Sequence, residues 1–170
     1  MRLLITALMV FINFILQTTL LQMFAIRGVL PNTALIIAVS YALLRGSREG
    51  AFVGIGAGLL QDIFFSGTLG AYALLYAVLA VLFGRSQRDF YRENYLLPVL
   101  FCSIAACLCE GAVYIVGFVF QGMGNLLYFL FQVMLPVMVY TAVITVPIYR
   151  ILFGVNDWLE LKEKYKYRLF

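Results

Sequence analysis

Residues 50–76 read GAFVGIGAGLLQDIFFSGTLGAYALLY, and this stretch decides how the chain folds. It is apolar and rich in glycine, and its one charged residue is Asp62. Gly50, Gly54, Gly58 and Asp62 are spaced four apart, so on a helix they share one slanted row of the surface. Because three of these positions carry no side chain, the row predicts a close contact with a neighbouring helix.

The same stretch predicts a helical hairpin whose tip carries no charge. A turn is expected at Ser66 and Gly67, and a second apolar segment follows it. Gly70, just after the turn, is counted with the glycines that are expected to pack helices together. The rest of the chain is expected to pack around this hairpin.

Composition places the chain among integral membrane proteins. Hydrophobic residues make up 64% of the 170 residues and charged residues 12%, whereas soluble domains have roughly half and about a quarter. The alternation typical of a membrane barrel is absent, and the apolar runs approach the ~20 residues with which a helix crosses a bilayer. The predicted fold class is therefore an all-α integral membrane protein.

Six membrane-spanning helices are predicted, and the second, third and fourth are short. Residues 1–156 would form this transmembrane domain, and residues 157–170 an amphipathic tail on the cytoplasmic side. The predicted helices cover residues 3–26, 30–44, 50–66, 68–84, 95–120 and 126–153.

The basic residues predict the orientation of this bundle. With six crossings, eleven of the twelve Lys and Arg residues fall on the side of both termini, and Arg27 alone falls on the other. Basic residues favour the cytoplasmic side, so both termini are predicted to be cytoplasmic. On the cytoplasmic side, basic residues of one loop and of the tail are expected to form a basic surface that meets anionic lipid headgroups or an acidic partner. Its residues are Arg85, Arg88, Arg92, Lys162, Lys166 and Arg168.

Two acids, Asp62 and Glu110, lie inside predicted membrane helices. At ~1.5 Å per residue both fall in the outer half of the bilayer, at a height similar to Gln17 and Gln132. An acid in the membrane costs ~2.5 kcal/mol or more on insertion scales, so it normally faces a cavity, a bundle interior or a partner. We therefore expect one outer pocket or partner-docking site that involves these four residues. A purely structural polar clasp is the alternative.

No Lys or Arg lies in the membrane core to pair with these acids. They are therefore expected to be protonated or hydrogen-bonded to Asn and Gln side chains rather than paired with a cation. On this hypothesis the neutral substitution Asp62→Asn should be mild.

The inventory of reactive residues argues against an enzyme. The chain has no histidine, and it lacks a glycine loop of the kind that cradles phosphate. Its three cysteines, Cys102, Cys107 and Cys109, lie in one apolar run and are expected to be small packing residues. No catalytic residue, metal, cofactor or nucleic-acid partner is therefore expected.

These features resemble the MreD family, the small polytopic subunit of the bacterial rod-shape machinery. The resemblance covers roughly the first half of the chain, and many family members have an acid where Asn32 stands. It rests on Pro31, on Tyr41-Ala-Leu-Leu-Arg-Gly46, on Gly50 through Gly58-Leu59-Leu60-Gln61-Asp62, and on Leu69-Gly70-Ala71-Tyr72-Ala73-Leu74.

The resemblance implies a non-enzymatic scaffold in the bacterial cytoplasmic membrane that binds MreC. Such a scaffold would work with RodA and a class B penicillin-binding transpeptidase, and would connect peptidoglycan synthesis indirectly to MreB filaments. The family is also similar in its six-helix arrangement to the substrate-binding membrane subunits of energy-coupling-factor vitamin transporters. The alternative function is therefore a vitamin-binding subunit whose pocket is the outer polar layer.

Overall fold

The computed structural model describes residues 2–23, 30–66, 69–86, 96–121 and 126–167, and these ranges contain helices and turns but no strand. The predicted all-α class is therefore confirmed for this part of the chain. In chain order the elements are α1 (Arg2–Met23), α2 (Thr33–Arg45), α3 (Ser47–Gln61), the π-helical turn η1 (Asp62–Ser66), α4 (Ala71–Gly84), α5 (Leu96–Gln121), α6 (Leu126–Phe129), the π-helical turn η3 (Leu130–Met134) and α7 (Leu135–Tyr167).

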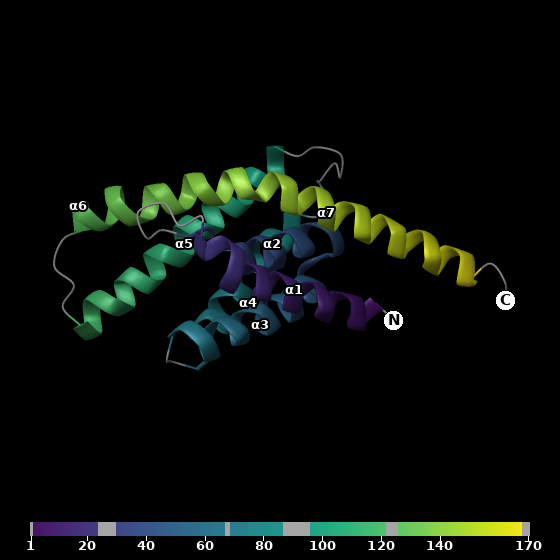
Figure 1. The fold of residues 1–170 in the computed structure, drawn as a ribbon, viewed down its shortest axis with the longest axis horizontal. Coiled ribbons are helices and arrows are strands. Elements are labelled where there is room, and N and C mark those ends of the chain that lie inside the picture. The colour runs from purple at the N-terminus through teal and green to yellow at the C-terminus, as the bar shows by residue number, and fades with distance from the viewer. Residues whose placement is uncertain (1, 24–29, 67–68, 87–95, 122–125, 168–170) are drawn as a thin grey trace.

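The short helix α2 forms the centre of the molecule (Figure 1). All of its residues from Thr33 to Leu44 are buried, which suits a helix that is apolar on every side. It contacts α1, α3, α4, α5 and α7. Pro31 and Asn32 precede its first turn, and the Asn32 side chain caps it by accepting the backbone N–H of Leu35 at 3.1 Å.

The glycine row of α3 brings helix backbones close together. A Cβ added at Gly54 would lie 2.9 Å from the carbonyl carbon of Tyr76 in α4, and one at Gly58 would collide with the α4 backbone. A Cβ at Gly50 would instead collide with Ala42 of α2. The row therefore meets two helices, α2 near its start and α4 along the rest.

Gly70 differs from the packing position expected of it. No atom lies within 4 Å of the place that its Cβ would occupy, but its φ of 100° is in the left-handed region that favours glycine. Gly70 is the residue that precedes the first turn of α4. Its role is therefore to let the chain turn into α4, rather than to admit a neighbouring helix.

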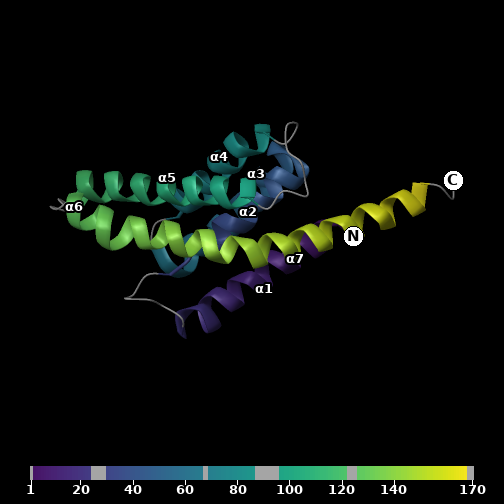
Figure 2. The ribbon, with the colours of Figure 1, turned by 90° about the horizontal axis from the view of Figure 1, so that it is seen from above.

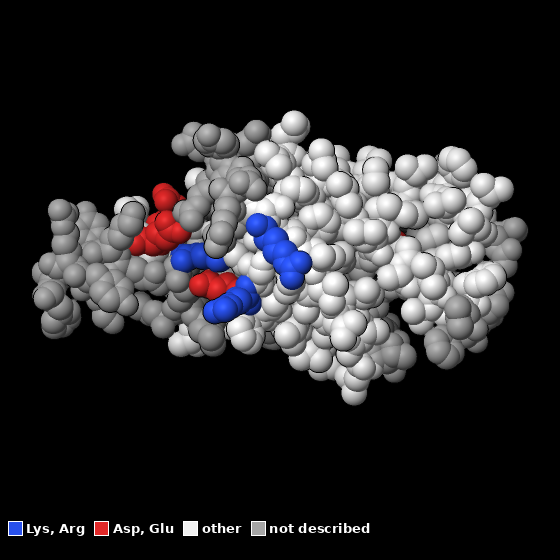
Figure 3. Space-filling model, turned by 180° about the vertical axis from the view of Figure 1, so that it is seen from behind, with Lys and Arg blue, Asp and Glu red and all other residues white. Residues whose placement is uncertain are grey.

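Charged side chains gather toward one end of the molecule, and the other described residues on the face drawn in Figure 3 are almost all white. Two contacts define this charged end: a Cβ at Gly84 would lie 2.7 Å from Ser47, and Arg45 donates a hydrogen bond to Asn156. They bring together the end of α2, the start of α3, the end of α4 and the middle of α7. Such segregation is typical of a bundle with one end in the cytoplasm.

Two described helices are long and apolar enough to cross a membrane, Leu96–Phe118 and Leu126–Lys162. Only 22% and 17% of their most apolar windows are buried, which fits helices whose sides face lipid better than the core helices of a soluble protein. Leu4–Thr19, Thr33–Arg45 and Ala71–Gly84 are shorter apolar helices. Six crossings with both termini in the cytoplasm stay a prediction.

This orientation predicts the result of a labelling experiment. A single cysteine at Gly124 should react with a membrane-impermeant thiol reagent added outside intact cells, because the loop between the last two predicted helices is external. A cysteine at Gln87 should react only after the membrane is permeabilised. Both positions lie outside the described residues, and the reverse pattern would overturn the orientation.

The last predicted helix continues beyond its expected end. α6, η3 and α7 form one continuous helical segment (Figures 1 and 2). The turn η3 lies next to Pro136, whose missing N–H removes a regular helix bond. The predicted boundary at residue 156 falls inside α7. There Asn156 accepts the hydrogen bond from Arg45 and donates one to Glu160 at 3.4 Å. The division at 156 into a bundle and a tail stays a prediction.

Candidate binding pocket

Asp62 lies near the tip of the hairpin, where α3 passes into η1. Its buried carboxylate accepts three backbone N–H groups from the other arm, those of Gly70 at 2.9 Å, Tyr72 at 3.0 Å and Ala73 at 3.1 Å. These donors lie at the start of α4, where N–H groups lack partners within the helix and the helix dipole favours negative charge. The carboxylate therefore ties the end of α3 to the start of α4.

These contacts are those of the polar clasp that the sequence left as an alternative. Both carboxylate oxygens are used, since Oδ2 accepts from Gly70 and Ala73 and Oδ1 from Tyr72. Asparagine has only one acceptor oxygen, so the expectation that Asp62→Asn is mild loses its physical basis. A further role of Asp62 in partner binding stays a prediction.

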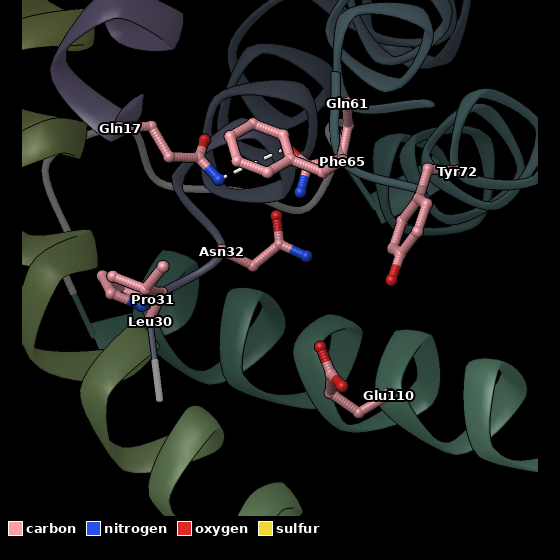
Figure 4. A pocket seen from close by; sticks show the side chains of 8 residues that line it. All are labelled: Gln17, Leu30, Pro31, Asn32, Gln61, Phe65, Tyr72 and Glu110. Carbon is pink, nitrogen blue, oxygen red and sulfur yellow. Dashed lines mark hydrogen bonds between the residues drawn. The ribbon is translucent and has the colours of Figure 1, made fainter. Parts of the chain in front are cut away.

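An open pocket lies beside the hairpin, near the end of α3 and the start of α4, which is the opposite end from the charged one. Figure 4 shows that the side chains around it come from segments far apart in the sequence. They lie on α1, on the segment before α2, on α3, on η1, on α4 and on α5. The lining residues are Gln17, Leu30, Pro31, Asn32, Gln61, Phe65, Tyr72 and Glu110.

A layer of hydrogen-bonded side chains supports one wall of this pocket. The Gln17 side chain accepts the hydroxyl of Thr33 at 2.9 Å and donates to Gln61 Oε1 at 3.3 Å. Asn32 Oδ1 accepts the hydroxyl of Tyr76 at 2.8 Å as well as its helix-capping N–H. These bonds fix α1 and the start of α2 against the hairpin, because few competing partners exist in an apolar bundle.

Glu110 enters the pocket from α5, opposite that layer (Figure 4). It is half-buried, and its carboxyl has no hydrogen-bond or ion-pair partner among the described residues. The amide nitrogens of Asn32 and Gln61 and the hydroxyl of Tyr72 are also without a partner within the described part of the chain. The pocket therefore presents one acid, two amide donors and a phenol.

The structure separates the four residues that the sequence grouped. Gln17 and Glu110 line the pocket, Asp62 lies behind it with its carboxylate turned to the α4 backbone, and Gln132 is exposed on η3. Gln132 does not line the pocket, and α6, η3 and the outer part of α5 form an arm that extends beyond the hairpin (Figure 1). Any role of these residues in binding stays a prediction.

The sequence missed Asn32, Gln61, Phe65 and Tyr72 as pocket residues. Asn32 and Gln61 carried a usable signal, since each is a polar residue inside or next to an apolar segment. Phe65 and Tyr72 carried none, because aromatic residues occur throughout the chain. Within the described residues, no three His, Cys, Asp or Glu side chains gather as a metal site. The pocket offers hydrogen-bonding groups and one carboxyl.

A family model described as rod shape-determining protein MreD matches residues 1–156. The chain belongs to the MreD family. This is a family of membrane proteins that determine rod shape, so the expected family is confirmed. Comparison with curated proteins gave no match, and comparison with solved structures gave none either.

The match to MreD ends at residue 156, so it includes the pocket and leaves out three of the six residues of the predicted basic surface, Lys162, Lys166 and Arg168. Of that surface, Arg85 and Lys162 are exposed, and Lys162 lies 4.4 Å from the centre of the Trp158 ring. Arg88, Arg92 and Arg168 lie outside the described residues, and so does the side chain of Lys166. Whether these six residues form one surface stays a prediction.

Proposed function

We propose that this member of the MreD family is a non-enzymatic membrane scaffold of the cell-elongation complex that binds MreC. The observation that carries the proposal is the family match over residues 1–156. Through MreC, the scaffold links peptidoglycan synthesis by RodA and a class B penicillin-binding transpeptidase to cytoplasmic MreB filaments. It does so as a six-helix protein of the bacterial inner membrane.

The distribution of charge supports such a role. One end of the bundle carries Arg45, Arg48, Glu49 and Arg85, and this is the end proposed to face the cytoplasm. The other end holds the pocket, and apolar side chains cover the sides of α5 and α7. A membrane scaffold needs two such polar ends, one for cytoplasmic and one for external partners, joined by a surface that lipids and partner helices can cover.

Co-purification from membranes tests the proposal. The full chain, tagged and expressed with MreC from the same bacterium, should retain MreC through detergent extraction, whereas an unrelated multi-pass protein carrying the same tag should not. A chain that folds but never retains MreC would overturn the scaffold function. The vitamin-transport alternative predicts a different result. Biotin, riboflavin or thiamine would bind the folded chain and raise its melting temperature by mass action.

A further inference from the structure

The pocket contains an acid, Glu110, to which the described residues offer no hydrogen bond and no cation. Asp62, the other acid at this end of the bundle, is saturated by backbone N–H groups and turned away. Glu110 has no such bonds among the described residues, and no described Lys or Arg lines its pocket. An unpaired carboxylate within a membrane bundle is costly, so it marks a place where a compensating group can bind.

The other residues that line the pocket indicate which chemical group could bind beside Glu110. Phe65 and Tyr72 line the pocket with aromatic rings, which attract a cation through their faces. A carboxylate together with aromatic rings is a combination suited to an ammonium or guanidinium group. Asn32 Oδ1 already accepts two hydrogen bonds and Gln61 Oε1 accepts one, whereas the Glu110 carboxyl and the Tyr72 hydroxyl accept none among the described residues.

Other classes of ligand fit less well. A calcium ion takes six to eight oxygen ligands, and this pocket offers a single carboxylate beside a phenol and three amide oxygens that already accept hydrogen bonds. An anion would be repelled by Glu110. A large apolar ligand would leave the two amide N–H₂ groups and the acid buried without partners, which is unfavourable for each of these groups.

We propose that this pocket binds a positively charged nitrogen from outside the chain, an amine or a guanidinium group, with Glu110 as its counter-ion. Two sources carry this chemistry at the outer surface of a membrane: a Lys or Arg side chain of a partner's membrane segment, and the amine of a lipid headgroup. The proposal rests on the proposed orientation, which places the pocket at the outer end of the bundle, and not on MreC binding. It deepens the scaffold function by giving the outer end of the bundle a recognition site.

Protection of a reporter cysteine tests the proposal. Leu30→Cys places a thiol on the pocket wall without removing a polar group, and Leu69→Cys is the matched control, since Leu69 is exposed beside the hairpin turn. The purified full chain is treated with the neutral reagent N-ethylmaleimide in the presence of ethylammonium chloride. Sodium chloride at equal concentration and neutral ethanol are the comparison additives, and the rate of the parent chain is subtracted.

Ethylammonium should slow labelling at position 30 in proportion to occupancy, so that half-occupancy halves the rate, and it should leave position 69 unchanged. Adding Glu110→Gln should abolish this protection. Equal slowing by sodium or ethanol, or protection that persists with Glu110→Gln, would overturn the proposal. The comparison of additives remains decisive even if Glu110→Gln fails to fold.

Two further arms identify the source of the cation. Slower labelling in vesicles of phosphatidylethanolamine than in vesicles of phosphatidylglycerol alone supports a lipid amine. Slower labelling only in the complex with a co-purified protein supports a partner's basic side chain. Arg27 is the basic residue nearest to Leu30 in the sequence. If ethylammonium protects position 30 only after Arg27→Gln, the cation belongs to the chain itself and the proposal of an external group is wrong.

Discussion

Replacing Asp62 by asparagine should lower the free energy of unfolding by about 2 kcal/mol, and replacing it by leucine should lower it by about 4 kcal/mol or more. The carboxylate accepts backbone N–H groups of Gly70, Tyr72 and Ala73 with both of its oxygens. Asparagine keeps one oxygen and turns an N–H₂ group toward a buried N–H donor. Leucine leaves all three N–H groups without this partner.

Melting temperature and the yield of monodisperse protein after detergent extraction measure this effect. Glu110→Gln is the matched control, because it also removes one carboxylate charge at the same end of the bundle but breaks no hydrogen bond among the described residues. It should keep or raise stability, because it removes a carboxylate that has no partner among the described residues. If the melting temperature of Asp62→Asn equalled that of the wild type, or if Asp62→Asn and Glu110→Gln lowered it equally, the hydrogen bonds of Asp62 would not hold the hairpin together.

Gly58→Ala should destabilise the bundle by about 1–3 kcal/mol, in the range measured for overpacked cores. A Cβ at this position meets the backbone of α4 at Tyr72 and Ala73, which cannot move aside as a flexible side chain can. The two helices would have to separate, and with them the N–H groups that Asp62 holds. Gly58→Leu should therefore prevent folding.

Gly56→Ala is the matched control for Gly58→Ala. Gly56 lies on the same helix two residues earlier, and no atom lies within 4 Å of its Cβ position. Alanine there should be neutral or slightly stabilising, because glycine is the poorer helix former. The melting temperatures of the two variants give the comparison. If both were equal to that of the wild type, the close approach of α3 and α4 would be wrong.

The sequence by itself determined the helical class, the family and the position of most helices. The predicted helices at 30–44, 68–84 and 95–120 correspond to α2 at Thr33–Arg45, α4 at Ala71–Gly84 and α5 at Leu96–Gln121. Hydropathy, with glycine and proline at the ends of segments, is a local property, and helix boundaries follow from local properties. Hydropathy predicted an amphipathic tail after residue 156 but not that the last helix continues into it, because the turns that join them are helical without being apolar.

The tertiary structure alone decided what each polar residue does. Asp62 and Glu110 look alike in the sequence, since each is an acid inside a predicted membrane helix, yet among the described residues Asp62 is saturated with hydrogen bonds and Glu110 has no partner. Asp62 is satisfied by backbone N–H groups eight to eleven residues further along the chain, and every residue except proline carries such a group, so no residue type marks the donors. The partners of Glu110 depend on how α1, the start of α2 and the hairpin meet α5. How these helices pack depends on which of their faces fit together. This fit involves several distant segments of the chain at once, so it cannot be read from any one of them.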